Sequence, residues 1–172
     1  MNQSLFLLFY GFAHRSVAFD ELSVFVAVYL IWVVMAVIFF YLFKNDSRKA
    51  AVRDIMVVFG AAAAGYAIAV IVKNIFQSMR PFDVLTSVRS LIDESGYAFP
   101  SGHTTLLASF TGALWYGHRK AALWVGVATV LVGAARIIVG VHWPIDILGG
   151  LLIGLATGLV AQRIAKRVLP PR

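Results

Sequence analysis

An uncharged run of 22 residues, from Leu22 to Phe43, constrains this chain more than any other feature of its sequence. At ~1.5 Å per residue, a helix of that length crosses a hydrocarbon core of ~30 Å. The whole chain is 60% hydrophobic and only 13% charged, with a mean hydropathy of +0.84. A soluble domain of 172 residues cannot bury so much apolar surface, so the sequence predicts a membrane protein.

Four further apolar stretches predict more membrane helices joined by short connections. We expect spans at about 22–43, 55–72, 101–117, 121–135 and 146–161. The last four are near or below the usual ~17–25 residues, so they would include flanking residues or cross thinned lipid. Residues 1–19 hold an apolar stretch too short to span and predict an interfacial helix or a sixth helix. The predicted fold class is an all-α, polytopic membrane helix bundle, with residues 1–172 as one domain.

The placement of Lys and Arg accounts for most of the net charge of +7. Alternate loops contain ten of these residues on one side and five on the other. The richer set is Lys44, Arg48, Lys49, Arg53, Arg119, Lys120, Arg163, Lys166, Arg167 and Arg172, and the poorer set is Arg15, Lys73, Arg80, Arg89 and Arg136. By the positive-inside rule, the richer set is cytoplasmic. The sequence therefore predicts a multi-pass protein of the inner or plasma membrane, and nucleic acid is not an expected partner.

The outward loops gather polar residues at the ends of the predicted spans. They fall in three segments, Lys73 to Pro81, Phe99 to His103 and Ala135 to Asp146. Cations gathered at an interface repel one another unless an anion lies among them, and Arg pairs well with phosphate oxygens. A helix that starts after Pro100 adds free backbone N–H groups. The sequence therefore predicts a phosphate or diphosphate site formed by Lys73, Arg80, Ser101, Gly102 and Arg136.

His142 and Asp146 are the candidate catalytic pair. They lie four residues apart at the predicted start of a helix, so the carboxylate can bind one ring nitrogen and leave the other free. A neutral, oriented imidazole is a nucleophile, and His103 on another helix is the candidate acid for the leaving oxygen. This pattern predicts phosphoryl transfer through a phosphohistidine, which water then hydrolyses with His103 as base.

The acidic residues of the outward loop do not have the spacing of a metal site. We expect Asp83, Asp93 and Glu94 to lie in a solvated loop. No metal and no other cofactor is predicted. Trp143 is expected to be an interfacial anchor and Gly140 a turn residue.

The three segments resemble the three motifs of the type 2 phosphatidic acid phosphatase superfamily over about residues 55–161. The matching residues are Lys73 with Arg80 and Pro81, Pro100 to His103, and Arg136 with His142 and Asp146. The resemblance implies a six-helix membrane fold and metal-independent hydrolysis of a lipid phosphate. It also implies His142 as nucleophile, His103 as general acid and Asp146 as the supporting carboxylate. The third motif usually reads Ser-Arg, whereas this chain has Ala135, which removes one hydroxyl donor and leaves that of Ser101.

The short chain, the brief link from Arg80 to Phe99 and the start Gly11-Phe12-Ala13-His14 are similar to bacterial undecaprenyl-diphosphate phosphatases of the bacitracin-resistance type. That similarity implies hydrolysis of undecaprenyl diphosphate to undecaprenyl phosphate at the outer face, in support of peptidoglycan synthesis. Phosphatidylglycerophosphate, phosphatidic acid and lipid A are alternative substrates. An anion or proton transporter is the alternative from another class, although the chain lacks the internal repeats typical of one. No oligomeric state is predicted.

Overall fold

The computed structural model describes residues 2–45 and 47–168, and every regular element in these ranges is a helix. In chain order they are α1 (Asn2–Tyr10), α2 (Val17–Val24), the π-helix η1 (Phe25–Tyr29), α3 (Leu30–Asn45), α4 (Arg48–Phe76), α5 (Pro81–Val84), α6 (Gly102–Leu114), α7 (Arg119–Ile138) and α8 (Pro144–Val168). The predicted all-α fold class is confirmed. Arg172, which the charge count assigns to the cytoplasm, lies outside the described residues.

Four helical segments are long and apolar enough to cross a membrane, and they contain four of the predicted spans. They are Val17–Lys44, which joins α2, η1 and α3, then Arg48–Val84, Arg119–Ile138 and Pro144–Val168. Each segment is longer than the uncharged run that predicted it, because polar residues that flank the run are also helical. The run at 101–117 forms α6, which has only 13 residues and is shorter than a usual span. The total number of spans therefore stays a prediction.

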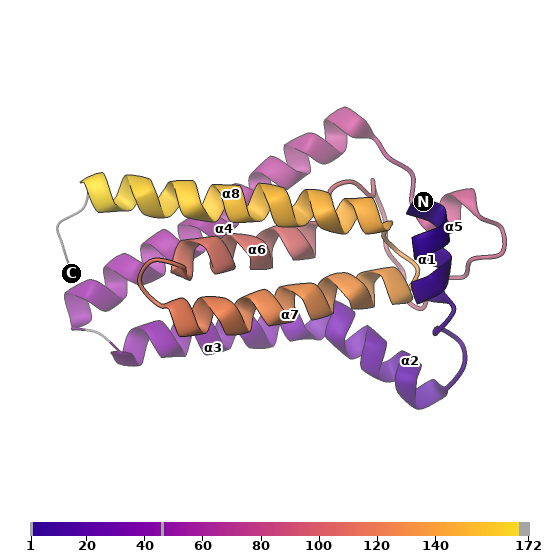
Figure 1. Cartoon of the computed structure of the whole chain (residues 1–172), viewed down its shortest axis with the longest axis horizontal. Coiled ribbons are helices and arrows are strands. Elements are labelled where there is room, and N and C mark those ends of the chain that lie inside the picture. The colour runs from indigo at the N-terminus through magenta and orange to yellow at the C-terminus, as the bar shows by residue number, and fades with distance from the viewer. Residues whose placement is uncertain (1, 46, 169–172) are drawn as a thin grey trace.

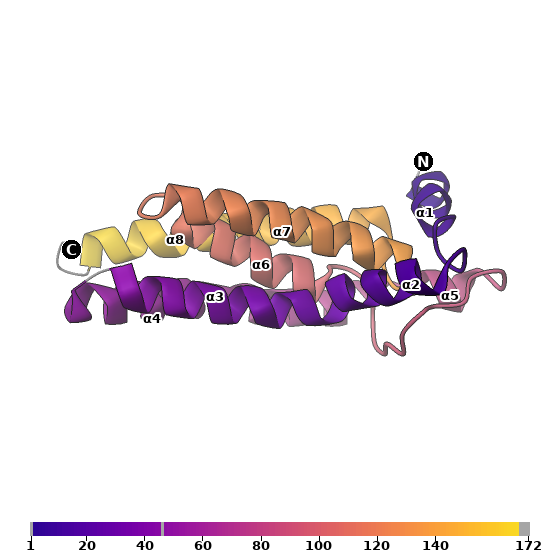
Figure 2. The ribbon, with the colours of Figure 1, turned by 90° about the horizontal axis from the view of Figure 1, so that it is seen from below.

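Helix α6 is the core of the bundle. Eleven of its 13 residues are buried, and Figures 1 and 2 show it enclosed by longer helices. Its hydroxyl groups bond within the helix, because Thr105 Oγ1 donates to Ser101 O at 2.8 Å and Ser109 Oγ donates to Thr105 O at 2.8 Å. These bonds satisfy polar groups that have no access to water. A helix that contains hydroxyl side chains can thus be buried inside an apolar bundle.

Glycines of α8 let that helix approach α6 closely. A Cβ atom added at Gly154 would lie 2.6 Å from the Ala108 Cβ and would also meet the Thr105 carbonyl oxygen. Small residues at such positions are the usual means by which membrane helices pack backbone against backbone. Gly150 and Gly158 of α8 likewise lie against backbone atoms of α6 or of the residue before it. The close approach matters for the site because α6 and α8 each begin at the same end of the bundle (Figure 1).

Helix α1 covers that end of the bundle. Figures 1 and 2 show it running across the direction of the long helices, and it contacts α7 and α8. Phe6 is fully buried and its ring lies 5.0 Å from that of Trp143, while Tyr10 Oη donates to Arg89 O at 3.0 Å. Helix α1 ends at Tyr10, and Val17 already belongs to the next helix, so the predicted segment 1–19 is two elements. Its relation to the membrane interface stays a prediction.

The two predicted charge sets lie at opposite ends of the bundle. Lys44 ends α3, Arg48 begins α4 and Arg119 begins α7, all far from α1 in Figure 1. Lys73 and Arg136 lie in the last turns of α4 and α7, at the end that α1 covers. The loops therefore alternate between the two ends as the charge count requires.

Replacing Gly154 with Ala should destabilise the protein, because the new methyl group would overlap backbone atoms of α6. Overpacking of this kind typically costs about 1–3 kcal/mol. The matched control is Gly60→Ala in α4, where an added Cβ meets nothing within 4 Å. Thermal unfolding in detergent should show a lower Tm for Gly154→Ala and an unchanged or higher Tm for Gly60→Ala. Equal Tm values for the two variants would mean that α6 and α8 do not pack as closely as described.

Candidate active site

Arg80 joins three segments that are distant in the sequence. It is the N-cap residue of α5 and is only 2% exposed. Its Nε donates to Gly96 O at 2.8 Å, its Nη1 to Val141 O at 2.9 Å, and its Nη2 to Ser95 O at 3.0 Å. A planar guanidinium with five N–H donors can hold several carbonyl groups in this way. Most of its donors are thus used on the backbone. The sequence predicted Arg80 as a residue that binds phosphate, and this role stays a prediction.

Lys73 also binds the loop between α5 and α6. Its Nζ donates to the carbonyl oxygen of Tyr97 and, at 3.3 Å, to that of Ala98. Both cations of the first motif therefore hold the segment 95–98, which leads directly into the second motif. Backbone carbonyls are weaker partners for an ammonium group than a phosphate oxygen, so Lys73 remains able to exchange them for an anion.

Arg136 is the most buried cation of the site. It is 1% exposed, and its Nη2 donates to Glu94 Oε2 at 2.7 Å. Its Nε and Nη1 are buried and have no hydrogen-bond partner in the part of the chain that the structure describes. Buried donors of this kind are rare and call for a ligand, because an unpaired N–H group loses its hydration without compensation. These two donors match the predicted anion site.

Glu94 lies in the cation cluster, and the expectation that it belongs to a solvated loop is wrong. Its carboxylate forms ion pairs with Arg136 at 2.7 Å and with Arg80 at 3.4 Å, and its side chain is only 25% exposed. Burial opposes its ionisation, but the charges of Arg136 and Arg80 outweigh burial and lower the pKa of Glu94. Asp93, in contrast, is exposed as expected. The spacing of the loop gave no signal for this contact, because it joins residues 42 positions apart.

The predicted catalytic pair is formed and buried. His142 is 1% exposed, and its Nδ1 lies 3.3 Å from Oδ2 of Asp146, which is fully buried. The same carboxylate oxygen accepts a hydrogen bond of 2.7 Å from Trp143 N. With Nδ1 facing the carboxylate, Nε2 is the ring nitrogen left for chemistry. The turn that brings His142 back over α8 uses Gly140, whose φ of +87° suits glycine.

His142 is held in its neutral form. Burial, followed by the charges of Arg136, Arg80 and Lys73, lowers the pKa of His142 well below its usual value. The shift means that these three cations lie near enough to act on the imidazole. A neutral imidazole with a free nitrogen has the lone pair that a nucleophile requires.

The second motif meets the third through the backbone. Ser101 N donates to Asp146 O at 3.0 Å, which fixes the start of α6 against the start of α8. Ser101 is fully buried, and its Oγ accepts a hydrogen bond of 3.1 Å from Thr104 Oγ1. No side chain caps this helix among the described residues, so the N–H groups that begin at Gly102 remain available to an anion. His103 follows in the first turn and is partly buried.

Two further residues near the site have contacts that the sequence analysis did not predict. Trp143, predicted as an interfacial anchor, donates from Nε1 to Met79 O at 3.0 Å and so ties the first motif to the third. Ala135, which replaces the motif Ser, is 5% exposed and packs in an apolar cluster with Ala27, Val139 and Val141. The missing hydroxyl therefore leaves an apolar contact in its place.

The structure brings all eight predicted site residues to one end of the bundle. They are Lys73, Arg80, Ser101, Gly102, His103, Arg136, His142 and Asp146. Within the described ranges, no group of three or more His, Cys, Asp or Glu side chains is placed to hold a metal ion. The arrangement is that of a buried anion site with a neutral imidazole beside it.

This fold and this site define a membrane-embedded phosphatase, and comparison with known proteins gives the family. The PAP2 superfamily matches residues 54–169, and the chain belongs to this family. It is a membrane lipid phosphate hydrolase, as the resemblance implied. The transporter alternative is not retained.

The relatives support the predicted subgroup. The chain is 27% identical to undecaprenyl-diphosphatase BcrC of Bacillus subtilis over 172 residues, which cover 99% of this chain and 87% of that protein. It is 38% identical to phosphatidylglycerophosphatase B of Escherichia coli, but over 84 residues that cover 45% of this chain and 33% of that protein. The crystal structure of Aquifex aeolicus LpxE superposes with a TM-score of 0.76 at 26% identity and covers 94% of both chains.

Replacing Asp146 with Asn should lower kcat by about 10²- to 10⁴-fold, because a neutral amide cannot stabilise the positive charge that develops on the His142 ring when Nε2 attacks phosphorus. Asn keeps the volume of Asp and an oxygen for Trp143 N, so the Tm should change little. The matched control is Asp93→Asn, an exposed position that should retain activity. Phosphate release in detergent measures both variants, and an Asp146→Asn enzyme as active as Asp93→Asn would contradict the role of the carboxylate.

Proposed function

We propose that this enzyme hydrolyses a polyprenyl diphosphate, converting undecaprenyl diphosphate to undecaprenyl phosphate through a phosphohistidine at the outward end of the bundle. The observation that carries the proposal is the neutral, buried His142, oriented by Asp146 and surrounded by cations. A nucleophile placed among positive charges suits an anionic phosphoryl group. The proposed roles are nucleophile for His142, general acid for His103, and phosphate binding for Lys73, Arg136 and the start of α6.

In the first step, Nε2 of His142 attacks the terminal phosphorus, and the bond from that phosphorus to the bridging oxygen breaks. His103 gives its proton to the bridging oxygen, which leaves as part of the lipid monophosphate. The free donors of Arg136, together with Lys73, stabilise the charge on the equatorial oxygens. Arg80, with most of its donors on carbonyl groups, acts chiefly by holding the loop that carries these partners.

In the second step, water attacks the phosphorus of phosphohistidine. His103, now neutral, takes one proton of the water, and the bond between phosphorus and Nε2 breaks. The products are inorganic phosphate and His142 in its original neutral state. No step needs a metal ion, so chelation with EDTA is expected to leave the rate unchanged.

An apolar pocket beside His103 supports a lipid substrate. It has a volume of about 330 Å³ and lies between α3, α4 and the start of α6. Its lining residues are Ile31, Trp32, Met35, Tyr66, Gly102, His103 and Leu106. Trp32 is 65% exposed on this side, and such an exposed aromatic surface suits contact with lipid. A chain that remains in the bilayer can thus reach the site from the side while its headgroup meets His103.

The relatives favour a diphosphate substrate without excluding a glycerolipid. The match to the undecaprenyl-diphosphatase BcrC extends over nearly the whole chain, including the N-terminal helix that covers the site. The match to phosphatidylglycerophosphatase B is confined to about half of the chain. The sequence match outside the motifs is therefore longer with the diphosphatase.

A comparison of substrates tests the proposal. Purified protein without added metal should release phosphate from undecaprenyl diphosphate at least about tenfold faster than from phosphatidylglycerophosphate or phosphatidic acid, given that one decade corresponds to ~1.4 kcal/mol of discrimination. His142→Ala should give no release from any of them and serves as the blank. Faster release from a glycerolipid would keep the mechanism and overturn the substrate. Restoration of EDTA-treated enzyme by magnesium would contradict the metal-independent route.

The orientation of the site can be tested with single cysteines, because the natural chain has none. Asp93→Cys lies on the exposed outward loop, and Lys49→Cys lies on an exposed position at the opposite end of the bundle. A membrane-impermeant maleimide added to intact cells should label Asp93→Cys and should label Lys49→Cys only after permeabilisation. The reverse pattern would overturn the predicted topology and place the site in the cytoplasm.

A further inference from the structure

The carboxylate of Glu94 occupies a donor of Arg136, the buried cation proposed to bind the phosphate of the substrate. It pairs with Arg136 at 2.7 Å and with Arg80 at 3.4 Å, two cations that are 1% and 2% exposed. Arg136 still has two buried N–H donors without a partner among the described residues. One carboxylate with two oxygens therefore leaves the buried positive charge only partly matched, whereas a phosphate has more oxygens to offer.

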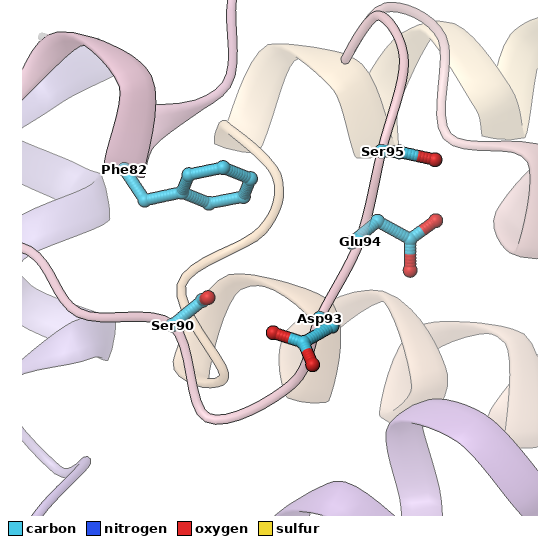
Figure 3. A pocket seen from close by; sticks show the side chains of 5 residues that line it. All are labelled: Phe82, Ser90, Asp93, Glu94 and Ser95. Atoms are coloured by element: carbon cyan, nitrogen blue, oxygen red, sulfur yellow. The ribbon is translucent and has the colours of Figure 1, made fainter.

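Glu94 also separates these cations from an open polar cavity. The cavity has a volume of about 420 Å³ and is lined by Phe82, Ser90, Asp93, Glu94 and Ser95. Figure 3 shows Asp93, Glu94 and Ser95 in succession along one stretch of the loop, with Phe82 across from them. Glu94 thus lies at the boundary between the buried guanidinium of Arg136 and the outward surface. An ion that leaves Arg136 toward water passes this side chain.

We propose that Glu94 is a built-in competitor of phosphate: its carboxylate holds Arg136 and Arg80 between turnovers, yields to the phosphoryl group of the substrate, and returns as inorganic phosphate leaves through the polar cavity. This inference rests on the proposed function, because it assumes that Arg136 binds the transferred group. The side chain is not a catalytic group, since it forms no bond with the reacting atoms. Its effect is on the affinity of the site for phosphate.

The competition follows from the charges. Two buried cations without a counter-ion would bind any phosphate tightly, and inorganic phosphate would then be slow to leave. The Glu94 carboxylate has a lowered pKa and is attached to the adjacent loop, so its local concentration near the two cations is high. It therefore re-forms the ion pairs readily when phosphate leaves. The site can therefore bind a highly charged diphosphate and still release the phosphate product. A carboxylate that only braced the loop would lower stability when removed but would not tighten phosphate binding.

The test is the binding of inorganic phosphate to Glu94→Gln. Thermal unfolding of the purified protein is followed against sodium phosphate at ionic strength held constant with sodium chloride. Glu94→Gln should be stabilised by phosphate with a half-saturating concentration at least about tenfold below that of the natural protein, a shift of one decade per ~1.4 kcal/mol. Asp93→Asn, which lines the same cavity and has no ion pair in the described part of the chain, should respond like the natural protein. Equal or weaker phosphate binding by Glu94→Gln would overturn the inference.

A second variant covers the case in which Glu94→Gln does not stay folded. Glu94→Asp keeps the negative charge but shortens the side chain, so its carboxylate reaches Arg136 less well and phosphate should again bind more tightly. Unchanged phosphate affinity in Glu94→Asp would overturn the inference. Lipid hydrolysis measured on the same preparations separates the two proposals. Tighter phosphate binding by the variants, together with no lipid turnover by the natural protein, would contradict the proposed function alone. Normal lipid turnover by the natural protein, together with unchanged phosphate binding by the variants, would contradict the competitor alone.

Discussion

The guanidinium of Arg80 is the contact on which the site end of the molecule depends. Its donors reach the loop before α6 and the turn before α8, so one side chain sets the spacing of all three motifs. Val141 is fully buried, so its carbonyl group needs a partner within the protein, and Arg80 supplies that partner while its own buried charge is satisfied in return. The burial of Arg80 and the order of the loops therefore support each other. A lysine could not reproduce these contacts, because an ammonium group lacks the planar fork of N–H donors that reaches both loops.

The catalytic arrangement is built on that frame. Close packing of α8 on α6, through Gly154 and its neighbours, brings the starts of both helices to one end. The bond from Ser101 N to Asp146 O then fixes the carboxylate, and the carboxylate fixes the ring of His142. The low pKa of His142 follows from the same burial and the same cations that attract phosphate. The same charges that would attract a phosphate thus also keep His142, the proposed nucleophile, in its neutral form.

Much of this could be predicted from the sequence, because membrane helices and motif residues leave local signals. Uncharged runs located the long helices, and the four-residue spacing of His142 and Asp146 predicted their contact. The expectation that the short runs would include flanking residues agrees with α7 and α8, which extend beyond them, whereas α6 is shorter than the run that predicted it. Contacts between distant loops gave no local signal, and so Glu94 was placed in solvent although it pairs with Arg136. The contacts of Arg80 with carbonyl groups could not be predicted for the same reason, because backbone partners have no sequence signature.

The central claim is that His142 carries the phosphoryl group, and trapping the intermediate tests it most directly. His103→Ala should slow the second step more than the first, since a phosphate is a good leaving group even without an acid, whereas the attacking water depends on the base. Rapid alkaline quenching of this variant after mixing with the diphosphate lipid, followed by mass spectrometry, should detect phosphohistidine at residue 142 and not in His142→Ala. A phosphoryl group on any other residue, or hydrolysis by His142→Ala at the natural rate, would contradict the account.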